Sequence, residues 1–264
     1  MVSVCEKAGV LFMAGHIMHF MDGVRAARDL IADGEIGRVL VARGARTGWV
    51  DDDGSVPGWK RRREMSGGHL FHHIHELDVI QLVMGRAERV TMIGGNLAHQ
   101  DVAADEDDVL LASLEFPGGA VGTMQWGSAF RVPEHYVEFL GTTGSVRIDL
   151  QAVGVEVRTA DGVRRLNLHR SAEEDAERLA EYEASRSGGG VDYGNPHMRP
   201  PRWLIGIMER ELEYLHGLLR GEREVDPVLA GLTDGSAARD SIATAHALTL
   251  SLAEDRKVSV AELA

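Results

Sequence analysis

Four histidines gather in one short stretch of the chain, directly after the glycine pair Gly67-Gly68. They are His69, His72, His73 and His75. An imidazole titrates near neutral pH, so it can take up or release a proton during a reaction. It is also a common ligand of divalent transition metals. The stretch therefore predicts a site for acid/base chemistry or for polyol binding, with a metal site as the alternative.

A helix has to position these side chains. The apolar spacing of Leu70, Ile74, Leu77 and Met84 predicts one helix from about Ser66 to Met84, ended by Gly85. In such a helix four possible ligands share one face, and they form the metal alternative: His69, His72, His73 and Glu76. His75 lies about 60° to the side of His72 around the same helix.

The rest of the chain predicts an α+β fold, with an open, mostly antiparallel β-sheet packed on helices. Tight turns such as Pro117–Gly119 and Gly141–Gly144 separate most of the expected strands. The expected strands are Val10–Ala14, Val39–Thr47, Arg89–Leu97, Val109–Phe116, Ala120–Ser128, His135–Leu140, Ser145–Leu150 and Val155–Thr159. The other expected helices are Met1–Ala8, Asp22–Asp33, Ser171–Arg186, Trp203–Leu219 and Thr233–Ala253.

Composition excludes several classes of partner. The net charge of −13 disfavours nucleic acid and anionic membranes. No apolar run reaches the roughly 20 residues that a membrane span needs. Cys5 is the single cysteine, so no internal disulfide forms, and we expect a cytoplasmic protein.

Three blocks occur in a fixed order along the chain. The first is Ala14–Phe20, before a helix that leads into Gly34–Val39. The second is Ser66–Gly68 with His75–Asp78. The third is Val137–Val146, before a terminal helix. Together they resemble the C-terminal α/β domain of the Gfo/Idh/MocA oxidoreductases over nearly the whole chain.

The resemblance implies the substrate-binding part of an NAD(P)-dependent oxidoreductase that acts on a sugar, cyclitol or related polyol. In this family a nucleotide-binding domain carries NAD or NADP, and no G-x-G-x-x-G motif opens a helix in this sequence. We therefore expect that domain to be absent and the chain not to be active alone. Residues 1–15 are then the remnant of the nucleotide-binding domain. Residues 16–264 form the substrate-binding and oligomerisation domain, whose last helix (about 233–254) packs back on the missing part.

The family pattern also assigns roles to residues. His75 and Asp78 match its His-x-x-Asp signature, which makes His75 the acid/base. The aspartate that usually precedes this signature is missing, and His72 is the expected substitute. We expect substrate contacts from a wider set near the strand ends and loops: His16, His19, Arg46, Trp49, Trp59, Lys60, His69 and His135. No residue of this chain is assigned to the nucleotide.

Two other functions stay open. One is a histidine- or metal-dependent lyase, epimerase or hydrolase that acts on an oxidised sugar. The other is a sugar-binding or oligomerisation module without catalysis. In every case we expect a small-molecule sugar or polyol as ligand and a homo-oligomer formed through the sheet.

Overall fold

The structure is a computed structural model, and it describes residues 1–51, 59, 62–99, 106–185 and 200–263. The chain divides into two compact units, each built from two segments. Unit 1 comprises Met1–Gly37 and Thr143–Ala238, and unit 2 comprises Arg38–Thr142 and Arg239–Ala264. Each unit is described separately.

Unit 2 contains a sheet in the strand order β5-β1-β4-β3-β2-β9. Strands β1 and β4 run parallel, and the other neighbours in this order run antiparallel. The strands are β1 (Val39–Trp49), β2 (Arg89–Gly95), β3 (Val109–Glu115), β4 (Val121–Gly127), β5 (Ala129–Gly141) and β9 (Val258–Ser259). The prediction of an open, mostly antiparallel sheet packed on helices is confirmed.

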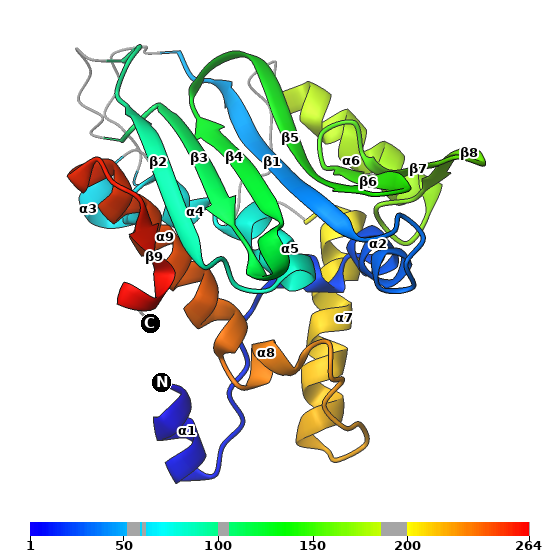
Figure 1. Cartoon of the computed structure of the whole chain (residues 1–264). Helices are drawn as coiled ribbons and strands as arrows, with labels where there is room; N and C mark the ends of the chain where they lie inside the picture. Colours follow the sequence, from blue (N-terminus) through cyan, green and yellow to red (C-terminus); the bar gives the residue numbers. More distant parts are fainter. Residues whose placement is uncertain (52–58, 60–61, 100–105, 186–199, 264) are drawn as a thin grey trace. The chain divides into compact units, whose positions relative to one another are not determined.

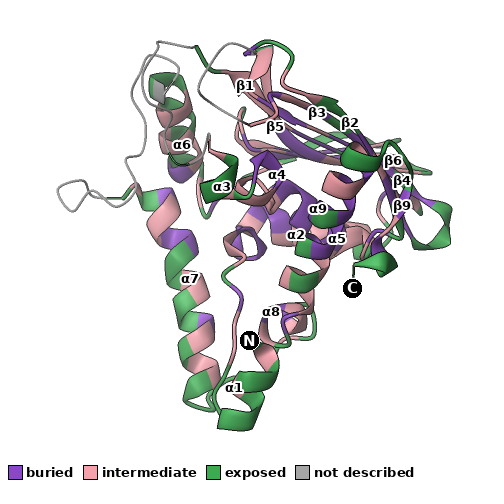
Figure 2. Ribbon diagram, turned by 90° about the vertical axis from the view of Figure 1, so that its left-hand side faces the viewer, coloured by how far each residue is buried: buried purple, intermediate pink, exposed green. Residues whose placement is uncertain are grey.

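Helices cover one face of this sheet (Figure 1). They are α4 (His69–His72), α5 (His75–Met84) and α9 (Ser236–Glu254). The first three residues of α9 belong to unit 1, and the rest of these helices belongs to unit 2. Three short helices complete the unit: α3 (Arg63–Ser66), η3 (Pro117–Gly119) and η4 (Val260–Glu262). The buried residues of α5 and α9 and of the strands above them form the core (Figure 2). Alternate residues of β3 and β4 face this core, among them Leu114, Met124 and Trp126. On the opposite face, Ile93, Leu111 and Val121 are exposed.

Unit 1 contains an antiparallel meander of β6 (Gly144–Asp149), β7 (Gly154–Thr159) and β8 (Gly162–Leu166). Its helices are α1 (Val2–Ala8), η1 (Ile17–Phe20), α2 (Asp22–Ala32), α6 (Ala172–Ser185), α7 (Arg202–Leu219) and α8 (Ala230–Thr233). Helix α2 packs closely on the meander, because a Cβ at Gly23 would lie 2.8 Å from Leu168 and Val155. The predicted strand at Val10–Ala14 is wrong: this segment is irregular.

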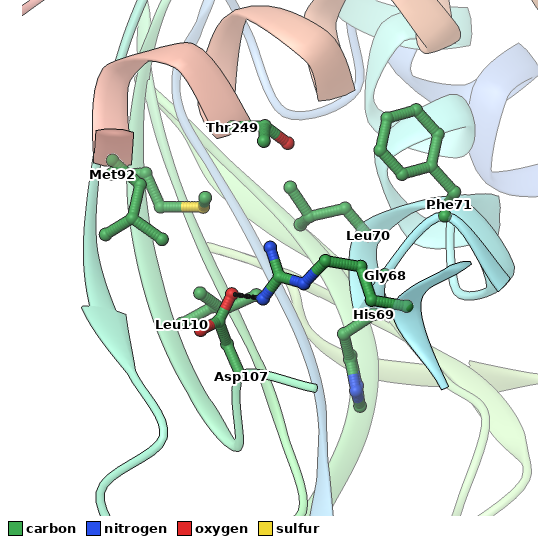
Figure 3. A pocket seen from close by; sticks show the side chains of 11 residues that line it. Gly68, His69, Leu70, Phe71, Met92, Asp107, Leu110 and Thr249 are labelled. Carbon is green, nitrogen blue, oxygen red and sulfur yellow. Dashed lines mark hydrogen bonds and ion pairs between the residues drawn. The ribbon is translucent and has the colours of Figure 1, made fainter. Parts of the chain in front are cut away.

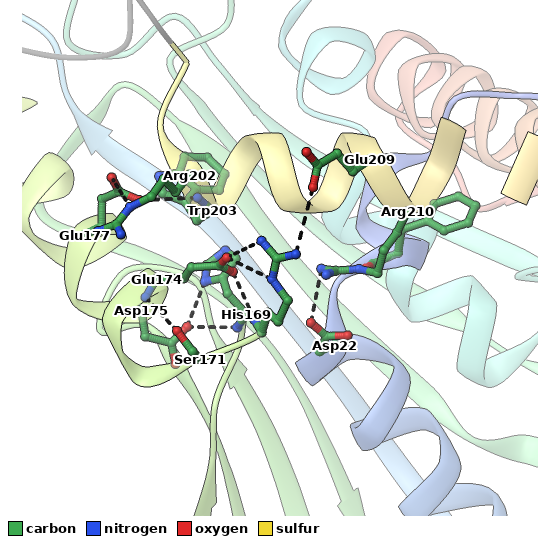
Figure 4. A network of polar contacts seen from close by, with 12 residues as sticks. Asp22, His169, Ser171, Glu174, Asp175, Glu177, Arg202, Trp203, Glu209 and Arg210 are labelled. Atoms are coloured by element: carbon green, nitrogen blue, oxygen red, sulfur yellow. Dashed lines mark hydrogen bonds and ion pairs between the residues drawn. The ribbon is translucent and has the colours of Figure 1, made fainter. Parts of the chain in front are cut away.

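A polar network connects α6 and α7 to the loop that joins β8 to α6 (Figure 4). The Arg170 guanidinium lies 2.7 Å from Oε1 of Glu174 and 3.9 Å from Oε2 of Glu209. His169 is buried, and its Nδ1 lies 2.8 Å from Oδ1 of Asp175. The Asp175 carboxylate also accepts the backbone N–H groups of residues 168 and 169. These contacts fix the start of α6 without involving any residue predicted to do chemistry.

The predicted single helix from Ser66 to Met84 is wrong, because the chain breaks it into α3, α4 and α5. Gly67 and Gly68 have φ values of 78° and 102°, which residues with a side chain rarely adopt. A second break follows α4, where the carbonyl of His73 accepts a hydrogen bond from Nε1 of Trp126 at 3.2 Å. The apolar spacing from Leu70 to Ile74 continues through the second break, which is why the sequence pattern missed it. The first break lies before Leu70, and the predicted start at Ser66 disregarded the glycine pair.

Candidate functional site

The first turn of α5 brings a buried carboxylate against two side chains of the sheet. Arg46 of β1 and His135 of β5 lie directly opposite each other in the antiparallel register. Oε1 of Glu76 lies 3.0 Å from Nη1 of Arg46 and 2.6 Å from Nε2 of His135. Glu76 is fully buried, while about a third of the Arg46 side chain is exposed. We call Arg46, Glu76 and His135 the polar triad.

The charges of the polar triad depend on one another. Burial by itself raises the pKa of the Glu76 carboxyl, but the positive charges of Arg46 and His135 offset this and hold that pKa well below its usual range. The neighbouring His75 acts in the same direction. Glu76 is therefore ionised, and it keeps the guanidinium of Arg46 in place at the edge of the buried region.

The two residues of the predicted His-x-x-Asp signature lie on α5 in different surroundings. His75 is the first residue of the helix and is partly exposed. Asp78 is buried, and its Oδ1 accepts a hydrogen bond from Oγ of Ser241 on α9 at 3.2 Å. His75 is thus accessible at the helix end beside the polar triad, whereas Asp78 fastens α5 to α9.

The other histidines of the run form a separate group on α4. The ring centroids of His69, His72 and His73 lie between 4.1 and 5.0 Å apart. The metal alternative grouped them with Glu76, but the structure pairs Glu76 with Arg46 and His135. Instead, Glu106 lies beside them, with its Oε1 3.2 Å from Nδ1 of His72. Sequence reasoning missed Glu106, which belongs to the acidic run that precedes β3 and looks like a solvated turn.

A small pocket opens next to this group (Figure 3). Gly67, Gly68, Phe71, Met92 and Leu110 are among the residues that line it. Arg63 and Asp107 also line it, and they form an ion pair at 2.6 Å. Its volume of about 20 Å³ is enough for a single water molecule and too small for a sugar.

Trp49 and Trp59 have different surroundings. The Arg131 guanidinium lies 3.4 Å from the centroid of the Trp49 ring, and Nε1 of Trp49 donates to Asp51 at 2.7 Å. The ring of His99, which the sequence analysis did not single out, lies 5.2 Å away. Trp59 is half-exposed. Lys60, also expected to contact the substrate, lies outside the described residues.

His16 and His19 belong to unit 1. His16 immediately precedes η1, and His19 lies within it. Their ring centroids lie 5.7 Å apart. Burial raises the pKa of the Glu211 carboxyl on α7, and the charges of these two histidines act in the opposite direction. The structure thus groups His16 and His19 with a carboxylate that the sequence analysis did not single out.

The Gly67-Gly68 turn does not resemble a phosphate-binding loop. Its Gly68 N–H donates to Oγ of Ser66 at 3.0 Å, and a Cβ at Gly67 would lie 3.3 Å from the Phe71 ring. The turn packs on its own helix, so it has neither the space nor the free donors that a pyrophosphate needs.

None of the helices in the described ranges is long and apolar enough to cross a membrane.

Comparison with known proteins shows extended similarity. The chain is 47% identical over 265 residues to a 2,7-anhydro-N-acetylneuraminate hydratase of Mediterraneibacter gnavus. This alignment covers all of this chain and 70% of the relative. It is 44% identical over 265 residues to a protein of the same name from Escherichia coli, with 71% of that protein covered. Among solved structures, levoglucosan dehydrogenase in complex with NADH and levoglucosan has a TM-score of 0.69 at 19% identity, over 95% of this chain and 66% of that one. The model for the oxidoreductase family, C-terminal alpha/beta domain, matches residues 28–260, so the chain belongs to the Gfo/Idh/MocA oxidoreductase family.

Proposed function

We propose that this chain forms the substrate-binding part of an enzyme that hydrates 2,7-anhydro-N-acetylneuraminate or a closely related anhydro sugar acid. The support from relatives is the identity of 47% and 44% to two hydratases of that name along the full chain. The structural observation that carries the proposal is the polar triad, which holds a partly exposed arginine at a fixed position.

A sugar acid needs a cationic anchor. Arg46 suits this role because its guanidinium can bind a carboxylate through two parallel hydrogen bonds. Glu76 fixes the guanidinium from the buried side, so its remaining N–H groups can bind the substrate without a large loss of side-chain entropy. His135 is hydrogen bonded to the same carboxylate through its Nε2 and helps to hold it in place.

Hydration of an anhydro bridge needs an acid and a base. One C–O bond of the bridge breaks, its oxygen takes a proton, and the hydroxyl of a water molecule bonds to the carbon. We assign the proton transfer to His75, which is partly exposed at the start of α5 beside the polar triad. Asp78, tied to Ser241, then positions α5 rather than contacting the substrate.

The family also implies NAD or NADP in the complete enzyme. The Gly67-Gly68 turn does not fit a pyrophosphate, and we assign no residue of this chain and no step to the nucleotide. A second candidate, favoured by family membership, is NAD(P)-dependent oxidation of a sugar or polyol at the same site. We further propose that a second copy of the chain covers the exposed face of the unit 2 sheet around Leu111 and Val121.

The first experiment measures binding. Saturation-transfer NMR of the purified chain with 2,7-anhydro-N-acetylneuraminate should show transfer, and a neutral sugar such as glucose should show little. Arg46→Gln should weaken binding of the acid at least about tenfold, in line with the loss of one charge-assisted contact. Arg43→Gln is the matched control, because Arg43 lies on the same strand but pairs with Glu138. Equal binding by the Arg46 variant would contradict the proposal.

The second experiment separates the two reactions. Mass spectrometry of the sugar after incubation with the enzyme and NAD(P) distinguishes a gain of one water from a loss of two hydrogens. Absorbance of the reduced nucleotide provides the second readout. Net hydration without accumulation of reduced nucleotide supports the hydratase, and stoichiometric nucleotide reduction supports the dehydrogenase.

A further inference from the structure

A compact group of nitrogen and oxygen ligands lies where α4 and the residue after it meet Glu106, which precedes β3. We call His69, His72, His73 and Glu106 the histidine cluster. One nitrogen from each of the three imidazoles lies within 4.8 Å of the others. The side chains of His69, His72 and Glu106 are at most 10% exposed. This combination of imidazoles with a carboxylate in a nearly closed space is the donor set of a divalent transition metal.

Two buried atoms of the cluster lack a hydrogen bond. Nδ1 of His69 and Oε1 of Glu106 have no hydrogen-bond partner among the residues that the structure describes. Buried polar atoms in native proteins are nearly always satisfied, and an exception indicates a water molecule or an ion. Both atoms belong to the same cluster, so one bound cation would satisfy them together.

The spacing of the donors fits a tetrahedral ion. Nδ1 of His72 lies 3.2 Å from Oε1 of Glu106, and Nδ1 of His69 lies 3.7 Å from Oε2 of the same residue. Two ligands of a tetrahedral zinc ion, each about 2.0–2.1 Å from the metal, lie about 3.3 Å from each other. Small movements of the side chains would therefore place one ion in contact with all three residues.

The third histidine orients the first. Nε2 of His69 lies 2.9 Å from Nδ1 of His73. When Nε2 of His69 carries the proton and donates it to Nδ1 of His73, Nδ1 of His69 keeps its lone pair for a metal. The backbone at His73 is itself held by Nε1 of Trp126. The turn of α4 also sets His69 and His72 three residues apart, on one side of the helix.

We propose that the histidine cluster binds one divalent transition metal ion of the zinc type. Nδ1 of His69, Nδ1 of His72 and the Glu106 carboxylate are the ligands, and His73 is a positioning residue. With three protein ligands, the fourth position is open to water or to a substrate oxygen. The proposal goes beyond the hydratase function, which does not require it. It also gives His72 a metal-binding role in place of the acid/base role expected from the sequence.

The test uses the whole chain and zinc alone. Protein purified with chelator is dialysed against zinc chloride and then against metal-free buffer, and its zinc content is measured by elemental analysis. We expect about one zinc ion per chain and an increase in melting temperature. Competition with a chromogenic chelator gives the affinity, and cobalt in place of zinc should show the intense visible bands of a four-coordinate ion.

Variants assign the ligands. Glu106→Gln keeps the side-chain volume and should lower the zinc affinity at least about a hundredfold, as should His72→Gln. His73→Phe should lower it about tenfold, because it removes an orienting contact only. His216→Ala, on α7 in unit 1, is the control and should bind zinc normally. Circular dichroism checks that each variant is folded.

Two results would overturn the proposal. One is a zinc content far below one ion per chain in the unchanged protein. The other is stoichiometric zinc that folded Glu106→Gln and His72→Gln variants retain with unchanged affinity, because the ion would then bind elsewhere. Neither readout depends on sugar binding or turnover, so failure of the hydratase proposal and failure of the metal proposal can be distinguished.

Discussion

Nε2 of His135 lies 2.6 Å from Oε1 of Glu76, a carboxylate that is fully buried beneath the sheet of unit 2. The same oxygen lies 3.0 Å from Nη1 of Arg46. An arginine and a histidine from neighbouring strands thus converge on one oxygen of one helix residue. This arrangement couples the stability of the unit to the proposed substrate anchor.

Replacing Glu76 by Gln should destabilise the fold. The variant keeps the shape but leaves Arg46 and His135 without the negative charge that compensates their burial. Breaking a buried ion pair in this way costs about 3 kcal/mol, measured as a change in the free energy of unfolding in urea. Glu115→Gln is the control, since Glu115 pairs with Arg89 and Lys257 at the exposed surface, where the loss of an ion pair should change the unfolding free energy far less. Equal effects of the two substitutions would show that Glu76 is not coupled to its partners.

The same carboxylate should make the free energy of unfolding depend on pH in the acidic range. The pKa of Glu76 in the folded protein lies below its unfolded value of about 4.3. Its contribution is therefore complete above about pH 5 and is lost as the pH falls further, toward the folded pKa. The difference in unfolding free energy between the unchanged protein and Glu76→Gln should shrink as the pH is lowered from about 6 to about 3. Parallel curves over this range would contradict the prediction.

The sequence predicted the elements better than the contacts between them. Alternation of apolar residues and tight turns located β1 to β7, because these signals are local. The strand expected at Val10–Ala14 is irregular, and β8 was not expected. The break after His73 was missed because the apolar spacing from Leu70 to Ile74 continues through it, and the break at Gly67-Gly68 was missed because the predicted helix began at Ser66 despite the glycine pair. One of these breaks depends on the indole of Trp126, which lies far along the chain.

For the candidate site, too, the sequence predicted individual residues but not the contacts between them. Arg46 and His135 were each predicted from their own strand, but their pairing needs the register of β1 on β5. Glu76 is charged and lies on the apolar side of α5, so only its partners explain its burial. Glu106 was missed because an acidic run has no periodicity that distinguishes a ligand from a solvated turn.

Gly44 in β1 should not tolerate a side chain. A Cβ there would lie 2.3 Å from Sδ of Met124 and 3.2 Å from Cδ1 of Ile80. Gly44→Ala should therefore destabilise the protein by about 1–3 kcal/mol, since a packed core absorbs an added methyl group poorly. Gly48→Ala, in the same strand, is the control because nothing lies within 4 Å of its Cβ position. Urea unfolding of both variants measures the difference, and similar midpoints would show that Met124 moves aside freely.

His75→Ala tests the proposed proton transfer. Loss of a general acid or base lowers turnover by about a hundredfold or more, while substrate binding through Arg46 should change little. Turnover of the anhydro sugar acid and binding by NMR are measured on one preparation, in which this chain is joined to a nucleotide-binding domain of the family and NAD(P) is supplied. His246→Ala is a control for loss of a histidine, because His246 lies on α9 against the Phe71 ring. Near-normal turnover of the His75 variant would remove this residue from the acid/base role.

Glu211→Gln should stabilise unit 1 at neutral pH. Burial raises the pKa of the Glu211 carboxyl, so the folded state favours the protonated form, and ionisation at neutral pH weakens the fold. The stabilising contribution of the protonated form is present below the unfolded pKa and is lost as the pH rises through the folded pKa. Because solvent screens part of this effect, removing the charge should raise the unfolding free energy only modestly, by about 0.5 kcal/mol near pH 7, and the gain should vanish in acid. A decrease in stability at neutral pH would instead mean that the attraction to His16 and His19 outweighs the cost of burying the carboxylate.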